Sequence, residues 1–225
     1  MQRKESRFVE STVKFTGVQK SMRCSLRHEN LLRQNGWHSV AGIDEAGRGP
    51  LAGPVVAAAV ILPEGFRHAR LTDSKQLTPN ARDEIFVEIT ANTAIQWSVA
   101  SVEPVDIDRL NILRATHQAM RLAIAGLTTA PAHVLIDGLP VQPFPIPQTA
   151  LVRGDALSFS IAAASVVAKV TRDQIMRQCH AEYPDYGFDQ HKGYATPQHL
   201  AMLRRHGPCP IHRRSFAPVA EQWLF

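Results

Sequence analysis

Two adjacent carboxylates, Asp44 and Glu45, stand directly before a Gly-Arg-Gly sequence at residues 47–49. Carboxylates are good ligands for hard divalent cations. Glycines let the main chain approach a polar ligand closely, and an arginine between them can bind phosphate through its guanidinium group. This combination predicts metal-dependent chemistry on a phosphodiester.

Two more aspartates stand where strands are expected to end, Asp137 in VLIDG and Asp155 in LVRGDAL. A carboxylate just past an apolar strand is costly if it is buried alone, so either each one is solvated or several converge on a cation. Because aspartate beside glycine is ordinary turn chemistry, a single instance says little. Four carboxylates at the ends of separate elements favour convergence.

Asp44 and Glu45 cannot both face one site from a regular strand, because successive side chains point to opposite faces of the sheet. They can do so only if the strand ends or bulges at residues 46–49. We therefore expect Asp44 to be the central ligand and Glu45 to reach in from a distorted strand end.

Hydrophobic periodicity and turn signals predict the elements that position these residues. β-branched or alternating runs at 39–45, 55–62 and 94–102 predict an antiparallel meander, and runs at 133–136 and 149–152 predict two further strands. Helical spacing is found at 26–34, 80–91, 107–127, 158–180 and 197–206.

Two of these helices carry more detailed signals. The predicted apolar face of the helix at 107–127 consists of Leu110, Leu113, His117, Met120, Ile124 and Leu127. The last helix opens with Thr196 as its N-cap and Pro197 at the first helical position. The sum is an α/β fold with a central sheet and a helical C-terminal region.

The chain has 225 residues, enough for one sizeable core. We expect a catalytic domain at residues 37–225 after a partly flexible N-terminal extension at 1–36. A net charge of +5 favours an anionic partner without proving one. Three widely spaced cysteines argue against a disulfide framework or a zinc site, and this predicts a reducing, cytoplasmic location. No apolar stretch is long enough to predict a membrane span.

Beyond single residues, a series of segments closely resembles the bacterial ribonuclease HII family. The segments are GIDEAGRGPLAGPVVAAAVIL, LTDSKQLT, LNILRATHQAM, VLIDG, GD followed by IAAASVVAKVTRD, YGFDQHKGYATPQH and HRRSFAPV. They occur in family order from about residue 41 to residue 219. Such a series is far more specific than one short motif.

The resemblance implies a ribonuclease H-like fold with a mixed five-stranded sheet, and a catalytic, metal-binding quartet of Asp44, Glu45, Asp137 and Asp155. It implies two Mg²⁺ or Mn²⁺ ions, which in the two-metal scheme lie roughly 3.5–4 Å apart. The implied activity is endonucleolytic cleavage of the RNA of RNA–DNA hybrids and on the 5′ side of single ribonucleotides in duplex DNA. The products carry 5′-phosphate and 3′-hydroxyl ends, which suits ribonucleotide and primer removal.

The resemblance also implies how the substrate is recognised. Gly47, Arg48 and Gly49 match the family's ribonucleotide sensor, whose backbone contacts the 2′-hydroxyl that distinguishes RNA from DNA. Tyr194 matches the tyrosine that packs on the following sugar. Weaker substrate candidates are Lys75 and Lys169, for which a turn or an ion pair competes with a contact to the duplex. Arg213 and Arg214 are also candidates, because with His212 they form a basic cluster for which a solvated loop competes with a contact to the duplex backbone.

Several alternatives remain open from the sequence. One is a related nuclease of the same superfamily that cuts only long hybrids, and another is a basic nucleic-acid-binding protein without catalysis. The C-terminal residues 222–225 vaguely resemble a sliding-clamp peptide, but docking on the chain's own domain is the favoured interpretation. The family resemblance implies a monomer.

Overall fold

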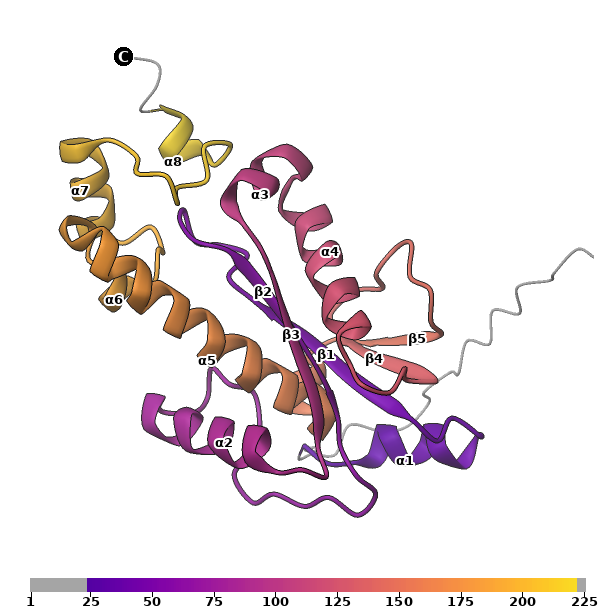
Figure 1. Ribbon diagram of the computed structural model, residues 1–225. Helices are drawn as coiled ribbons and strands as arrows, with labels where there is room; N and C mark the ends of the chain where they lie inside the picture. Colours follow the sequence, from indigo (N-terminus) through magenta and orange to yellow (C-terminus); the bar gives the residue numbers. More distant parts are fainter. Residues whose placement is uncertain (1–23, 222–225) are drawn as a thin grey trace, which may run out of the picture.

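A mixed five-stranded sheet forms the centre of the protein in the computed structural model, which describes residues 24–221 (Figure 1). The strands are β1 (Val40–Ala46), β2 (Val55–Ile61), β3 (Gln96–Val102), β4 (His133–Asp137) and β5 (Gln148–Leu151), and their order in the sheet is β3-β2-β1-β4-β5. The first three strands form the predicted antiparallel meander, and β4 and β5 continue the sheet parallel to β1.

Helices cover both faces of the sheet (Figure 1). One face packs against α5 (Phe159–Glu182) and α2 (Pro79–Ala91), and the other against α4 (Ile112–Ala125). The remaining elements are α1 (Arg27–Gln34), α3 (Pro104–Leu110), α6 (Phe188–His191), α7 (Pro197–His206), α8 (Ala217–Ala220) and the 3₁₀ turns η1 (Gly154–Ala156) and η2 (Pro184–Tyr186). The functional side chains therefore belong to a three-layer α/β/α arrangement.

The pleat of β1 decides which of its side chains meet α5. Ala41 and Ile43 belong to the core on the α4 side, so Gly42 and Asp44 face α5. Gly42 leaves room for this contact, because a Cβ added there would lie 2.2 Å from the carbonyl carbon of Ser160 in α5. The absence of a side chain thus lets α5 approach the sheet beside Asp44.

The helix predicted at 107–127 is in fact two helices, and this part of the prediction was wrong. Asn111 adopts a left-handed conformation with φ of 73°, which ends α3, and its side chain accepts a hydrogen bond from the Arg114 N–H at the start of α4. The predicted apolar face is correct for Met120, Ile124 and Leu127, which are buried, and wrong for Leu113, which is 51% exposed. Small residues, Ala115 and Ala119, also pack on the sheet.

Thr196 caps α7 as predicted, since its hydroxyl accepts a hydrogen bond from the His199 N–H at 3.2 Å. That helix is not the last one, because α8 follows it.

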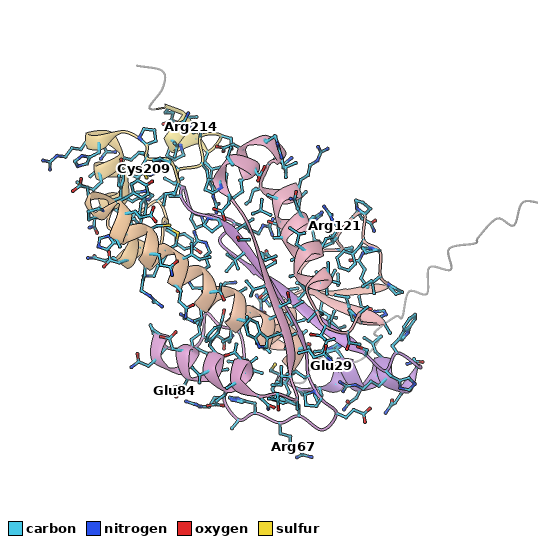
Figure 2. All side chains as sticks on the ribbon, viewed as in Figure 1. Glu29, Arg67, Glu84, Arg121, Cys209 and Arg214 are labelled. Atoms are coloured by element: carbon cyan, nitrogen blue, oxygen red, sulfur yellow. The ribbon has the colours of Figure 1, made fainter. Side chains whose placement is uncertain are left out.

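Helix α1, which lies within the expected N-terminal extension, packs on the domain (Figure 2). The fully buried Glu29 accepts hydrogen bonds from the Ser158 hydroxyl at 2.6 Å and from the Ser160 N–H at 2.9 Å, and so binds the N-terminus of α5. The expectations for residues 1–23 and for a clamp contact at 222–225 lie outside the described residues. In the part that is described, no helix is long and apolar enough to cross a membrane.

Candidate active site

Three carboxylates meet where β1, β4 and η1 end beside α5. The parallel register pairs Ile43 with Ile136, so the next residue on each strand brings Asp44 beside Asp137. Asp155 joins them from η1, and one carboxylate oxygen from each residue lies within 4.8 Å of the others. The structure thus brings together three of the four carboxylates that the sequence identified. We refer to Asp44, Asp137 and Asp155 as the acidic triad.

Burial and mutual repulsion shape the acid–base properties of the triad. Burial, followed by the negative charges of Glu45 and Asp137, raises the pKa of Asp44 well above its ordinary value. Burial, followed by the charges of Asp137 and Asp73, raises the pKa of Asp155 to about 6. Carboxyls that resist ionisation so near to one another are stabilised when a cation neutralises them. The donor set, hard oxygens at short mutual distance, fits a divalent ion such as Mg²⁺ or Mn²⁺.

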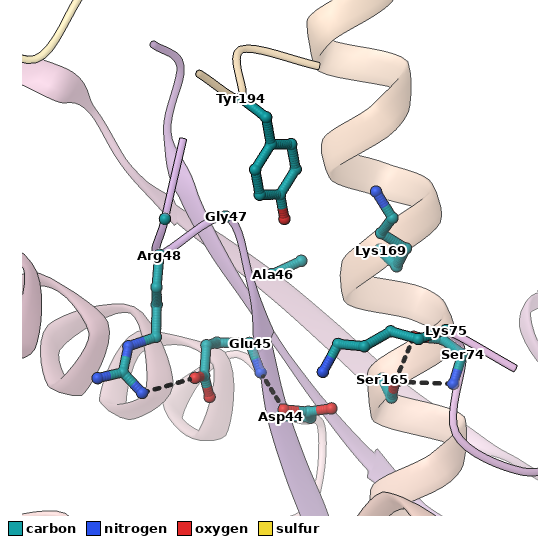
Figure 3. A pocket seen from close by; sticks show the side chains of 11 residues that line it. Asp44, Glu45, Ala46, Gly47, Arg48, Ser74, Lys75, Ser165, Lys169 and Tyr194 are labelled. Atoms are coloured by element: carbon teal, nitrogen blue, oxygen red, sulfur yellow. Dashed lines mark hydrogen bonds and ion pairs between the residues drawn. The ribbon is translucent and has the colours of Figure 1, made fainter. Parts of the chain in front are cut away.

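Glu45 is placed differently from the expectation of a distorted strand end. Strand β1 continues through Ala46 with regular antiparallel pairing, Glu45 opposite Ala57 and Ala46 opposite Val56, so the strand neither ends nor bulges between these residues. The Glu45 carboxylate accepts a hydrogen bond from Arg48 at 3.2 Å instead of joining the triad (Figure 3).

A pocket of about 300 Å³ opens beside Asp44, and its lining combines acidic, basic and aromatic groups (Figure 3). The lining residues are Asp44, Glu45, Ala46, Gly47, Arg48, Gly49, Ser74, Lys75, Ser165, Lys169 and Tyr194. Asp44, the Gly-Arg-Gly turn, Tyr194 and two of the weaker candidates therefore border one space. Sequence reasoning missed Ser74 and Ser165, whose hydroxyls hydrogen bond at 2.6 Å, because serines carry no distinctive spacing.

The two lysines of the pocket have different electrostatic environments. Burial disfavours the charged form of Lys75, but the negative charges of Asp44 and Asp73 outweigh it and raise its pKa. Lys169 instead forms an ion pair with Asp173 at 2.7 Å, which is the ordinary alternative that the sequence left open. Lys75 is therefore the lysine whose charge is directed at the triad.

The Gly-Arg-Gly turn begins where β1 ends, and its first glycine is required by the protein interior. Gly47 has a φ of 97°, a region that other residues rarely adopt. A Cβ at this position would also lie 2.0 Å from Nε of Arg172 and 2.8 Å from the carbonyl oxygen of Pro54. At Gly49, by contrast, a Cβ would meet only a ring atom of Tyr194, at 3.8 Å. The positive φ and the lack of space beside Arg172 explain the glycine at 47.

The expectation of an exposed basic cluster at residues 212–214 is corrected by the structure. His212 is 2% exposed and Arg213 is fully buried, so neither a duplex contact nor a solvated loop describes them. Arg213 instead donates hydrogen bonds to main-chain carbonyls of Gly47 and Arg48. Only Arg214 of the three is exposed, and its N–H donates to Asp108.

Tyr194 faces the pocket from the loop before α7, and its side chain is 45% exposed (Figure 3). A buried histidine network, formed by His199 and His212, supports this loop. His199 donates from Nδ1 to the Tyr194 carbonyl at 2.9 Å, so its Nε2 accepts from Nε2 of His212 at 3.0 Å. Burial lowers the pKa of both histidines, and His199 further lowers that of His212, to about 4. The network therefore consists of neutral imidazoles.

A mixed five-stranded sheet with helices on both faces, and with acidic residues converging near the ends of its central parallel strands, is the architecture of the ribonuclease H-like class. The sequence model described as Ribonuclease HII matches residues 41–219. The chain therefore belongs to the ribonuclease HII family.

Curated relatives and solved structures agree with this assignment. Ribonuclease HII of Desulfitobacterium hafniense strain DSM 10664 / DCB-2 is 55% identical over 197 residues, covering 88% of this chain and 75% of the relative. Ribonuclease HII of Bacillus thuringiensis strain Al Hakam is 52% identical over 195 residues, covering 87% of this chain and 75% of the relative. The crystal structure of ribonuclease H2 from Pyrococcus horikoshii OT3 superimposes with a TM-score of 0.70 at 27% identity, covering 82% of this chain and 96% of that one.

Two further solved structures are similar. The RNase HII of Archaeoglobus fulgidus, determined in complex with PCNA, has a TM-score of 0.65 at 26% identity and covers 78% of this chain and 93% of its own. Bst-RNase HIII, determined with Mn²⁺, has a TM-score of 0.61 at 18% identity, covering 85% and 71%, and shows the fold alone. The family consists of metal-dependent endoribonucleases that act on RNA–DNA hybrids, and this chain is accordingly a ribonuclease H.

Proposed function

We propose that this enzyme also nicks duplex DNA on the 5′ side of a single embedded ribonucleotide and leaves 5′-phosphate and 3′-hydroxyl ends. The observation that carries the proposal is the shared pocket, in which Asp44 of the triad, the turn at Gly47–Gly49 and Tyr194 border one space. A group that can hydrolyse a phosphodiester and a group that can inspect its sugar are thus adjacent.

The metal site is proposed at the triad, with Glu45 as a fourth carboxylate near it. Asp44, Asp137 and Asp155 would hold Mg²⁺ or Mn²⁺, and a pair of such ions would activate water and stabilise the leaving oxygen. The protein itself orients this site: the Gly154 N–H donates to Asp137 at 2.7 Å, and the Glu45 N–H donates to Asp44 at 2.7 Å. These hydrogen bonds fix one oxygen of each carboxylate and leave the other available as a ligand.

Substrate binding is proposed along the rest of the pocket. The backbone at 47–49 would contact the 2′-hydroxyl, and the exposed ring of Tyr194 would pack on the next sugar. Lys75 would hold a phosphate oxygen beside the triad, because its charge already faces the carboxylates. Lys169, paired with Asp173, and the exposed Arg214 are left as weaker contacts.

The direct test is incubation of a DNA duplex carrying one ribonucleotide with the enzyme and Mg²⁺ or Mn²⁺. A nick on the 5′ side of the ribonucleotide is expected, and an all-DNA duplex and Asp44→Asn enzyme are the controls. An intact single-ribonucleotide substrate under every metal condition, with an RNA–DNA hybrid cut in parallel, would favour the hybrid-specific alternative. Binding without cleavage of either substrate would favour the non-catalytic one.

We propose a cytoplasmic monomer that removes ribonucleotides and primers from DNA. Support comes from the expected activity and from the three widely spaced cysteines, which fit a reducing compartment. A sliding-clamp contact through residues 222–225 is a separate proposal, for which the PCNA complex of the Archaeoglobus relative is the precedent. A clamp pull-down with the full chain and with a chain lacking these four residues tests it.

A further inference from the structure

Two buried arginines lie beneath the Gly-Arg-Gly turn without an acidic partner. Arg172 of α5 is 1% exposed and Arg213 is fully buried. Among residues 24–221 neither forms an ion pair with a carboxylate. A buried charge without a counter-charge is unusual, because desolvation costs several kcal/mol unless hydrogen bonds replace water.

Main-chain carbonyls take the place of the missing carboxylate. Arg213 donates to Gly47 at 2.6 Å, to Arg48 at 3.0 Å, to Gly53 at 2.9 Å and to Pro54 at 3.1 Å. Every acceptor lies between β1 and β2, on or just after the turn that borders the pocket. The planar guanidinium group thus binds the turn from the protein interior, since Arg213 is fully buried and does not line the pocket.

Arg172 secures the same segment from α5. It donates to the carbonyls of Ala52 and Pro54 at 3.1 and 3.0 Å, and to that of Lys192, two residues before Tyr194, at 3.1 Å. The two arginines therefore connect the turn to the segment that carries Tyr194.

The orientation of the two peptide groups follows from these bonds. The peptides that join Gly47 to Arg48 and Arg48 to Gly49 are trans, so each N–H points away from its own C=O. Because Arg213 binds both carbonyls from behind, the N–H groups of Arg48 and Gly49 point away from it, on the exposed side of the turn. In the described part of the chain neither N–H has an acceptor.

We propose that Arg213 is a positioning residue for ribonucleotide discrimination, which orients and polarises the N–H groups of Arg48 and Gly49 toward the 2′-hydroxyl and adjacent phosphate. This inference rests on the proposed recognition of single ribonucleotides. A guanidinium bound to a carbonyl draws electron density through the peptide and strengthens the N–H at its other end as a donor. The pair of arginines gives the turn a positive charge that an anionic backbone neutralises.

The first experiment measures binding preference in enzyme that cannot turn over. In an Asp44→Asn background, affinities for a duplex with one ribonucleotide and for the same all-DNA duplex are compared with and without Arg213→Lys. Lysine keeps the charge but cannot donate to four carbonyls from one planar group. The ribonucleotide preference should fall at least tenfold while affinity for the DNA duplex changes less than threefold.

The matched control is Arg67→Gln, which removes one arginine charge from the exposed loop between β2 and α2 (Figure 2). It should leave the preference unchanged. If a folded Arg213→Lys variant kept the ribonucleotide preference, the role inferred for Arg213 would be overturned and the proposed function would stand. A parent enzyme without any ribonucleotide preference would instead overturn the proposed function on which the inference depends.

A second experiment avoids substitution at Arg213 altogether. Amide hydrogen exchange is measured by NMR in Asp44→Asn enzyme, free and bound to each duplex. The Arg48 and Gly49 amides should exchange rapidly in the free enzyme and become protected at least tenfold by the ribonucleotide duplex, but not by the all-DNA duplex. Protection already present in the free enzyme, or equal in both complexes, would show that the N–H groups are not the discriminating donors.

Discussion

Two clusters of like-charged side chains lie near the pocket, one acidic and one basic, and their charges are compensated in different ways. The triad of Asp44, Asp137 and Asp155 converges within 4.8 Å. Arg172 and Arg213 lie beneath the Gly-Arg-Gly turn, and among residues 24–221 their side chains donate hydrogen bonds only to main-chain carbonyls. The acidic triad needs a bound cation or a proton to neutralise its charge. The charges of Arg172 and Arg213 are instead compensated permanently by the dipoles of main-chain carbonyls.

This difference predicts which region responds to solution conditions. The carboxyls can be neutralised by a proton or by a cation, as the raised pKa values of Asp44 and Asp155 show. Arginine keeps its proton under ordinary conditions and is compensated by the fold itself. We call the acidic triad the acidic side, and Arg172 and Arg213 with the turn that they bind the basic side. Metal binding should therefore stabilise the protein through the acidic side, whereas a change in backbone conformation should destabilise it through the basic side.

The largest effect is expected from Asp44→Asn. Activity on a hybrid should fall by about 1,000-fold or more, because one ligand of the proposed metal site and its charge are removed. In metal-free buffer the free energy of unfolding should be unchanged or higher, since a buried carboxyl that repels Asp137 is gone. Cleavage assays and urea denaturation check the two parts. A strongly destabilised variant would show that Asp44 has a structural role instead.

Two glycine substitutions then test the basic side. Gly47→Ala should cost about 2–4 kcal/mol of unfolding free energy, because φ is 97° and the methyl group would overlap Arg172. Gly49→Ala is the matched control and should cost less than about 1 kcal/mol, since its Cβ meets only Tyr194 at 3.8 Å. If urea denaturation showed equal losses of unfolding free energy for the two variants, packing in the protein interior would not be the reason for glycine at position 47.

Metal addition should affect only the acidic side. At 100 times the dissociation constant, Mg²⁺ or Mn²⁺ should stabilise the folded enzyme by about 2.7 kcal/mol, which is visible as a higher Tm. Asp44→Asn should abolish most of this gain, whereas Arg67→Gln should retain it. A gain that survives in Asp44→Asn would place the ion elsewhere.

Local patterns made much of the fold predictable. The alternating and β-branched runs gave the five strands, and Thr196 followed by Pro197 gave the start of α7. The break at Asn111 was missed, because asparagine is tolerated within a helix and the sequence does not show that this residue adopts a positive φ. The convergence of the triad was predictable because Asp44 and Asp137 lie near or at the ends of strands that proved to be parallel neighbours.

The basic side was not predictable, since its contacts are non-local. Arg213 was interpreted as an exposed charge from its neighbours His212 and Arg214, but its acceptor at Arg48 lies 165 residues away in the sequence. Burial of arginine against carbonyls leaves no spacing signal, because main-chain acceptors exist in every residue. The distortion expected at the end of β1 was wrong for a related reason: the sequence shows a Gly-Arg-Gly turn but not that the regular pairing of β1 continues through Ala46.

The smallest effect concerns the neutral histidine network behind the basic side. Protonated His212 would carry hydrogen on Nδ1, which now accepts from the Cys209 N–H at 3.0 Å, so the folded state resists protonation. The folded pKa is lowered from 6.5 to about 4, and the unfolded chain therefore takes up the proton first as pH falls. The contribution of His212 is constant above pH 6.5 and is lost between pH 6.5 and 4.

Urea denaturation at pH 7.5 and 5 measures this contribution, which we expect to be about 2 kcal/mol. The triad has the opposite sign, because carboxyls with a raised folded pKa gain stability as pH falls, so the parent enzyme alone does not isolate the histidine. The difference between parent and His212→Gln does, since the triad is common to both. The acid-induced loss should be smaller in His212→Gln by about that amount. His206→Gln, which removes an exposed histidine at the end of α7, should behave like the parent, and equal losses in all three proteins would show that the network does not oppose protonation.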